Sequence, residues 1–358
     1  MSDAPSAATG LPIELPIIDI SKATPEVGRA MLDAATKYGF LYVDGASSDF
    51  SNEDVESAFE MSRKFFASPL EEKSEVEMQS DNKGWSGMHS ETLDPEHQQR
   101  GDFKEVINIG AFKDGKPIQK LPRSLAPREA EVNQFIALCQ QTCNRILTLL
   151  ALGLEVRISE PIPADWFTVR HDKSKGPNAD ILRFLFYPSI KAPSVSSFQH
   201  GVDVRAGAHS DYGSVTLLFQ RDGQPGLEIL ASNGEWCPVP IRPKQQQQPT
   251  TTGFPPILVN IGDILSFWTN GLLKSTVHRV IFPIDEQMSA SGRDRYSIAY
   301  FCHPLDDTEL TPVPSRLVEE HKRTEALPGP TGDNITAGMH LAHRLEVTYG
   351  RTRSNDKE

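Results

Sequence analysis

The feature that most constrains the fold is a change in the sequence pattern at Asp180. From there onward, short runs of β-branched and aromatic residues are separated by glycine, proline and asparagine. Strands bounded by such turn-forming residues are typical of an antiparallel all-β unit. The runs that predict strands are 181–187, 214–219, 227–230, 257–260, 264–268, 276–282 and 295–301. Short strands in this number suit a double-stranded β-helix, the two-sheet jelly roll.

The preceding half of the chain has the spacing of helices. After a short strand at 16–19, Thr24 and Pro25 provide an N-cap and a first-turn proline for a helix. Two further helices are predicted over 51–69 and 127–153, each with apolar residues repeating on one side. These segments are expected to pack on the β unit.

The fold class is therefore α+β, a jelly-roll core flanked by helices that come mostly from the N-terminal half. We expect an N-terminal helical and mixed region at 1–155, the core at 178–310, and a C-terminal helical segment and tail at 311–358. A stretch rich in glutamine and proline at 240–256 predicts a surface loop. The role of its glutamines at 245–248 is left open.

The composition limits the kinds of partner that the protein is expected to bind. A formal net charge of −12 argues against nucleic acid or an anionic membrane surface. The N-terminus lacks the pattern of a secretion signal, and no apolar run approaches about 18 residues. Four cysteines in 358 residues fit a reducing compartment, and Cys139 and Cys143 are expected in a helical core rather than on a metal. We expect a cytoplasmic protein that acts on a small molecule, with its oligomeric state open.

The stretch AHSDYGSVTLLFQ places charged residues in a strand-like run. In a strand, His209 and Asp211 would point to one face because side chains alternate. A single His-x-Asp pair also occurs as a purely structural pair. A second histidine, His278, lies 67 positions after Asp211 in another strand-like run. Two histidines and one carboxylate form a facial triad, which holds Fe(II) and leaves coordination positions open.

A third motif is DRYSIAYF, in which Arg295 and Ser297 share a face. An arginine that points into a jelly-roll interior loses several kcal/mol of hydration unless an anion accompanies it. A dicarboxylate would satisfy both side chains. The alternative for an isolated Arg-x-Ser is an arginine paired with a carboxylate of the protein itself.

Taken together, these motifs resemble the isopenicillin N synthase-like superfamily of non-haem Fe(II), 2-oxoglutarate-dependent dioxygenases. The resemblance extends over nearly the whole chain, through LPIIDIS, KYGFLYVDG, FKEVINIG, LRFLFYPS, GDILSFWTNGLLKSTVHRV and RYSIAYFCHP. It implies His209, Asp211 and His278 as iron ligands. Arg295 and Ser297 would anchor the distal carboxylate of 2-oxoglutarate, and Tyr187 matches a tyrosine that often touches it. The Leu185-Phe186-Tyr187-Pro188 sequence lacks the asparagine of the plant-type Asn-Tyr-Tyr-Pro.

The resemblance also implies a reaction. Fe(II) is the metal, 2-oxoglutarate and O2 are cosubstrates, and ascorbate is an optional supporting reductant. Oxidative decarboxylation of 2-oxoglutarate yields succinate and CO2 while a substrate C–H bond is hydroxylated or desaturated. The sequence motifs are similar to those of a fungal thymine dioxygenase-like group. In that group, residues matching Arg183, Tyr212 and Phe301 face a pyrimidine, whereas His303 replaces an asparagine. A heteroaromatic compound or a secondary metabolite is therefore expected as substrate.

Other functions remain open from the residues alone. A Zn(II) hydrolase could use the same triad. A cosubstrate-free oxidative cyclase of the isopenicillin N synthase kind also carries Arg-x-Ser, and succinate release distinguishes it. Trp85 and Met88, in a glycine-flanked segment, are one possible lid over the cavity.

Overall fold

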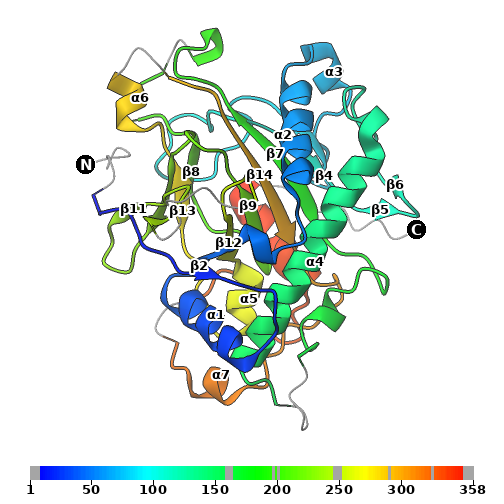
Figure 1. The fold of residues 1–358 in the computed structure, drawn as a ribbon, viewed down its shortest axis with the longest axis vertical. Helices are drawn as coiled ribbons and strands as arrows, with labels where there is room; N and C mark the ends of the chain where they lie inside the picture. The colour runs from blue at the N-terminus through cyan, green and yellow to red at the C-terminus, as the bar shows by residue number, and fades with distance from the viewer. Residues whose placement is uncertain are drawn as a thin grey trace.

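The computed structural model describes residues 9–157, 164–195, 198–199, 202–244, 252–288, 292–323 and 326–349. Two β-sheets form its centre, and the three longest helices of the N-terminal half pack against the larger sheet (Figure 1). The large sheet has eight strands in the order β1-β2-β12-β9-β14-β7-β4-β3, and the small sheet has four in the order β11-β10-β13-β8. The strands are β1 Ile17–Ile18, β2 Phe40–Val43, β3 Gly84–Ser86, β4 Glu105–Ile109, β5 Phe112–Lys113, β6 Lys116–Pro117, β7 Ile181–Tyr187, β8 Ala206–His209, β9 Val215–Phe219, β10 Leu227–Leu230, β11 Trp236–Pro238, β12 Ile257–Ile261, β13 His278–Val280 and β14 Arg295–Cys302.

The described residues form eight α-helices, of which the longest three in the N-terminal half pack against the large sheet. The eight helices are α1 Pro25–Lys37, α2 Asn52–Phe66, α3 Leu70–Ser74, α4 Glu129–Gly153, α5 Asp263–Trp268, α6 Ile284–Met288, α7 Arg316–Glu320 and α8 Ala337–Tyr349. The predicted start of α1 is confirmed, since the Thr24 side chain accepts a hydrogen bond from the Val27 N–H and Pro25 opens the helix. A reciprocal capping box between Ser51 and Asp54 starts α2.

Strand alternation divides the core into two layers. On the outer face of the large sheet, Phe184, Leu217 and Tyr300 pack with residues of the helices. On the inner face, Leu185, Leu258 and Ala299 pack with Leu227, Ile229 and Val280 of the small sheet. The two sheets thus face each other across an interior layer, and this arrangement is the predicted jelly roll within an α+β fold.

One predicted strand is wrong. Residues 264–268 belong to helix α5, which starts after Gly262. The first N–H groups of this helix donate to the carbonyls of residues 211–213, which lie far away in sequence. Because those acceptors satisfy the unpaired donors of a helix start, a short helix is stable here although the apolar run resembles a strand.

Two further expectations were also incomplete. The strand predicted around the His-x-Asp pair ends at His209, so Asp211 lies in the turn after β8 rather than on a strand face. Trp85 and Met88 do not form a lid over the interior cavities, because they line a separate pocket with Lys73 and Glu105 on the outer side of β3. The glutamines at 245–248 lie outside the described residues.

Helix α4 is long and largely apolar. Within the described residues, the helical segment 126–153, which comprises a 3₁₀ turn and α4, is the one long and apolar enough to cross a bilayer. Of its most apolar stretch of 18 residues, 61% is buried inside the protein. It packs against α1 and the large sheet. Cys139 and Cys143 are buried there as free thiols, which confirms their predicted place in the core.

Candidate metal centre and substrate cavity

The two histidines and the aspartate of the predicted triad come together between the sheets. His209 ends β8, His278 begins β13, and the two are direct partners in the antiparallel ladder. Asp211 Oδ1 lies 3.8 Å from His209 Nε2 and 3.7 Å from His278 Nε2. One ligand atom from each residue falls within 4.8 Å of the others. This spacing lets one ion contact all three side chains.

Hydrogen bonds aim these ligand atoms at a common point. The Nδ1 of His209 lies 2.8 Å from the carbonyl of Gly207, and that of His278 lies 3.2 Å from the carbonyl of Thr276. A proton on each Nδ1 leaves Nε2 with a free lone pair toward Asp211. Burial and the adjacent His278 lower the pKa of His209, which favours the neutral imidazole that a metal requires.

The second oxygen of Asp211 is held from the opposite sheet. Its Oδ2 accepts hydrogen bonds of 2.7 Å from the Thr216 hydroxyl and 2.7 Å from the Asn260 amide. Thr216 and Asn260 are cross-strand partners on β9 and β12. Burial alone raises the pKa of Asp211, but the two imidazoles and these two hydrogen bonds hold it below its usual range. Asp211 is therefore an anion with Oδ1 free for a cation.

Asn260→Ala tests this support. Partners of ligating carboxylates typically contribute about 10–100-fold in metal affinity or activity. We expect the affinity for Fe(II), measured anaerobically by calorimetry, to fall by about tenfold or more because Asp211 loses one of its two orienting donors. Asn233→Ala, a change on the exposed turn before β11, is the matched control and should leave affinity unchanged. Wild-type affinity in Asn260→Ala would show that Thr216 alone orients the carboxylate.

Beyond the triad, the interior cavity ends at a buried arginine. Arg295 is 2% exposed, and its guanidinium donates to the Gln224 carbonyl at 3.1 Å and to Ser297 Oγ at 3.2 Å. It lies over the Tyr187 ring at 4.9 Å. Burial lowers the pKa of Arg295. Within the described part of the chain, Glu286, the carboxylate that acts on Arg295 electrostatically, forms its ion pair with Arg205 at 2.8 Å instead. The alternative of an arginine paired with a carboxylate of the protein is thus not what the structure has, and the site fits a bound anion.

One face of β14 connects the arginine to the metal centre. Arg295, Ser297, Ala299 and Phe301 alternate along its inner side and line the same cavity as all three residues of the triad. At about 3.3 Å per residue, this row spans roughly 20 Å. A ligand anchored at Arg295 would extend along the strand toward the triad.

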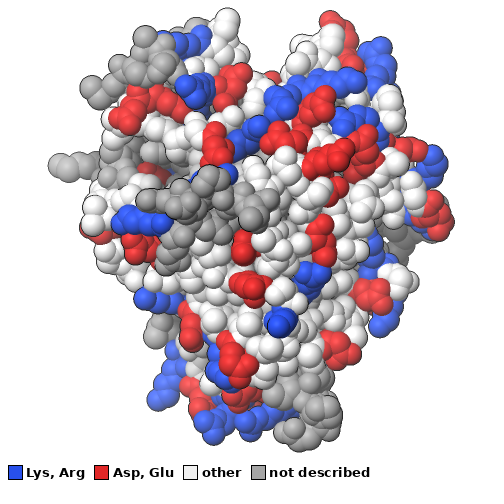
Figure 2. All heavy atoms as spheres, in the orientation of Figure 1, with Lys and Arg blue, Asp and Glu red and all other residues white. Residues whose placement is uncertain are grey.

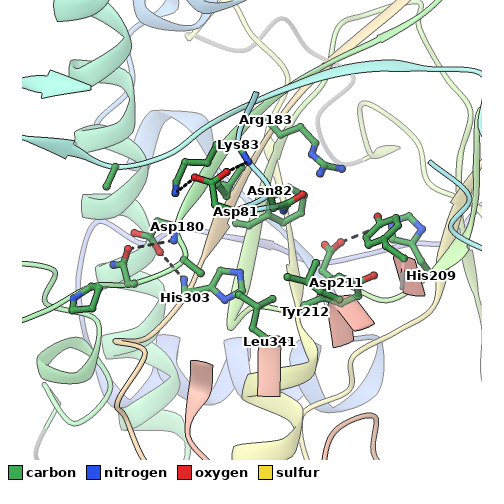
Figure 3. Close-up of a pocket in the computed structure, with 18 of the residues that line it drawn as sticks. Asp81, Asn82, Lys83, Asp180, Arg183, His209, Asp211, Tyr212, His303 and Leu341 are labelled. Carbon is green, nitrogen blue, oxygen red and sulfur yellow. Dashed lines mark hydrogen bonds and ion pairs between the residues drawn. The ribbon is translucent and has the colours of Figure 1, made fainter. Parts of the chain in front are cut away.

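A second cavity, of about 250 Å³, opens on the other side of the metal centre (Figure 3). Its lining includes Arg183, Tyr212, Phe301 and His303, so all four residues predicted to face a substrate meet there. Its wall is completed by the segment 81–83 and by α8. His209 and Asp211 line both cavities, which places the metal centre at their boundary.

The charges around Arg183 are already balanced. Its Nε donates to Asn108 Oδ1 at 2.6 Å, and its Nη1 lies 3.5 Å from Glu91 Oε2. Glu91 also lies 3.1 Å from the buried Lys104, which in turn pairs with Asp102. Arg183 lies 5.5 Å from the centre of the Phe301 ring. Arg183 is thus both a lining residue and half of an internal ion pair.

Several residues of the site were not identified from the sequence. Thr216 and Asn260 carried a usable signal, because each interrupts an apolar strand with one polar residue on the inner face. Glu91, Lys104 and Asn108 carried none, since their pairing with Arg183 joins positions far apart in the chain. The contribution of α8 was likewise unpredictable.

The arrangement is that of a known class. Residues 15–129 match the N-terminal model of the non-haem dioxygenases of morphine synthesis, and residues 178–304 match the 2OG-Fe(II) oxygenase superfamily. The chain belongs to the 2OG-Fe(II) oxygenases, an oxidoreductase family that uses Fe(II) and 2-oxoglutarate.

Among its relatives, a UPF0676 protein of Schizosaccharomyces pombe is 35% identical over 350 residues, which cover 94% of each chain. The 2-oxoglutarate-dependent dioxygenase ecdK of Aspergillus rugulosus is 31% identical, covering 90% of this chain and 93% of its own. Thymine-7-hydroxylase of Neurospora crassa, solved with α-ketoglutarate and thymine, is 29% identical with a TM-score of 0.72, covering 97% of this chain and all of that one. These similarities confirm the predicted family, fold class and reaction type.

Proposed function

We propose that this oxygenase hydroxylates a small, flat, uncharged heteroaromatic compound at a C–H bond. In this proposal His209, Asp211 and His278 hold Fe(II), and Arg295 with Ser297 anchors the distal carboxylate of 2-oxoglutarate beside Tyr187. The substrate lies in the cavity of Arg183, Tyr212, Phe301 and His303 (Figure 3). The observation that carries the assignment is that the cavity of the buried Arg295, which forms no ion pair with a described carboxylate, also contains the triad.

Each group has a distinct task in the reaction. When bound, Fe(II) supplies the chemistry that couples O2 and 2-oxoglutarate to oxidation of the substrate, with succinate and CO2 released. Asp211 and the two neutral imidazoles fix one face of the metal. The fork of Arg295 recognises a carboxylate with parallel hydrogen bonds. The buried strand faces exclude water from the reacting atoms.

The charge balance of the substrate cavity favours a neutral compound. Arg183 is compensated by Glu91, and Lys83 pairs with Asp81 at 2.8 Å. An anionic substrate would have to leave its hydration shell without an unpaired cation to receive it. Phe301, partly exposed in the cavity, offers a face for stacking a flat ring, and the guanidinium of Arg183 can donate to a carbonyl oxygen. The Neurospora relative was solved with thymine and with 5-formyluracil, both flat pyrimidines with carbonyl oxygens.

Matched pairs of compounds test the substrate class. Fe(II)-loaded protein is assayed for succinate release above the substrate-free rate with thymine against uracil-5-carboxylate and with nicotinamide against nicotinate. The proposal expects stimulation by a neutral member and none by its carboxylate. Stimulation confined to the carboxylates would contradict it.

Arg183→Ala tests whether Arg183 contacts the substrate or only stabilises the fold through its ion pair. If Arg183 contacts substrate, the apparent KM for the stimulating compound should rise about tenfold or more, because a hydrogen bond from a charged donor contributes about 1.5–3 kcal/mol. Substrate-free turnover of 2-oxoglutarate should persist because Arg295 is untouched. Arg29→Ala on the exposed side of α1 is the control. Loss of both activities together with a lowered Tm would show that the role of Arg183 is structural.

A further inference from the structure

A buried ion pair connects the C-terminal helix to the rest of the site. Arg344 Nε on α8 lies 2.9 Å from Asp263 Oδ2, and the Asp263 side chain is fully buried while that of Arg344 is 17% exposed. The Arg344 guanidinium also lies 5.0 Å from the centre of the Tyr212 ring. Removing two charges from water is unfavourable unless their geometry is well defined. The pair therefore indicates one specific position for α8.

Asp263, the partner of Arg344, holds the turn that carries Asp211. Its N–H donates to the Asp211 carbonyl at 2.7 Å, and its Oδ2 accepts from the Ser210 hydroxyl at 3.1 Å. The next residue, Ile264, donates its N–H to the Tyr212 carbonyl at 3.2 Å. The start of α5 thus fixes the backbone on both sides of Asp211. Asp263 therefore connects Arg344 of α8 to this turn.

The same C-terminal helix forms a wall of the substrate cavity. Leu341, Leu345 and Tyr349 follow one another at four-residue spacing, which places them on one face, and all three line the cavity. Leu341 lies beside Tyr212 in Figure 3, close to the red ribbon of α8. Arg344 is on the adjacent side of the helix, where α8 contacts α5. One helix therefore contacts both the substrate space and the turn that carries Asp211.

We propose that Arg344 is a positioning residue. Through its ion pair with Asp263, it couples the position of α8, a wall of the substrate cavity, to the position of the turn that carries Asp211. This inference rests on the proposed metal site. It requires the position of α8 and the metal site to be linked. If the position of α8 seen here favours the geometry that binds metal, then metal binding must favour this position of α8 by the same factor. Arg344 also lies 3.5 Å from the Ser210 hydroxyl, so its contacts reach both residues that flank Asp211.

Hydrogen exchange of the full-length protein measures the linkage without a substrate. Amide exchange of α8 is followed with no metal and with Mn(II) plus 2-oxoglutarate, because Mn(II) occupies such a site without turnover. Typical coupling between sites corresponds to about 5–150-fold. We expect exchange in α8 to slow by about fivefold or more, whereas α2, on the outer face of the sheet, should not change.

Substitutions then assign the linkage to the ion pair. In Arg344→Met, which keeps an apolar stem but removes the charge, protection of α8 by Mn(II) and 2-oxoglutarate should disappear. Arg344→Lys keeps the charge and should restore at least part of it. Arg316→Met, on the exposed ion pair of α7, is the matched control and should behave as wild type. In a double-mutant cycle, Asp263→Asn should add little to Arg344→Met, because both changes break one pair.

The outcomes separate this inference from the proposed metal site. Calorimetry on the same samples records whether Mn(II) binds. Binding without protection of α8 in the wild-type protein would overturn the Arg344 proposal while leaving the metal site intact, and this result does not depend on whether the variants fold. Protection that survives Arg344→Met would also overturn it. Absence of Mn(II) binding in the wild-type protein would instead contradict the triad and, with it, the inference.

Discussion

Asp211→Ala should abolish succinate formation at limiting Fe(II) and lower the affinity for Fe(II) by about 100-fold or more. The substitution removes the only anionic member of the triad, and loss of an orienting partner alone typically has an effect of about 10–100-fold. The loss of affinity is measured by anaerobic calorimetry and that of turnover by succinate release. The variant should still fold, since Asp211 lies between the sheets and is not part of the three apolar core clusters.

Folding needs its own measurement, because the substitution leaves Thr216 and Asn260 without their shared acceptor. Unpaired buried polar groups destabilise by about 1–3 kcal/mol each, which predicts a lower Tm but a cooperative transition. Asp33→Ala on the exposed side of α1 is the control for removal of a carboxylate. Full activity of Asp211→Ala at limiting Fe(II) would remove Asp211 from the metal site.

Arg295→Lys should raise the apparent KM for 2-oxoglutarate about tenfold or more. The planar fork of arginine donates two parallel hydrogen bonds to a carboxylate, which the single ammonium of lysine does not reproduce. A tenfold change corresponds to about 1.4 kcal/mol, within the range for hydrogen bonds to charged groups. The KM is measured from succinate release over a series of 2-oxoglutarate concentrations.

The matched control is Arg316→Lys on the solvent-exposed α7, which should leave this KM unchanged. The KM for the stimulating substrate should move much less than the KM for 2-oxoglutarate in Arg295→Lys, because Arg295 lines the interior cavity and not the substrate cavity. An unchanged KM for 2-oxoglutarate would mean that another group holds the distal carboxylate.

The elements that the sequence predicted well are those with local signals. Caps such as Thr24 and Ser51 satisfy the helix start from within a few residues, so their effect is legible in the sequence. The strand 181–187 matches β7, and its alternation correctly placed Arg183 and Tyr187 on the inner face. The two histidines and the carboxylate that the strand-like runs suggested as a triad do lie close together.

The elements that escaped prediction depend on distant partners. Residues 264–268 form a helix because carbonyls of residues 211–213 accept its first hydrogen bonds. Asp211 leaves the strand after His209, yet reaches the metal centre because Thr216 and Asn260 hold it from the other sheet. The neutralisation of Arg183 by Glu91 joins residues 92 positions apart. No local pattern encodes such pairings.

The most direct test of the account is an anaerobic titration of the wild-type protein with Fe(II) and 2-oxoglutarate, followed by admission of air. The account predicts one Fe(II) per chain, a visible charge-transfer absorption that appears only when both are present, and formation of succinate once O2 enters. Tight Fe(II) binding with no absorption on addition of 2-oxoglutarate and no succinate after O2 would contradict it.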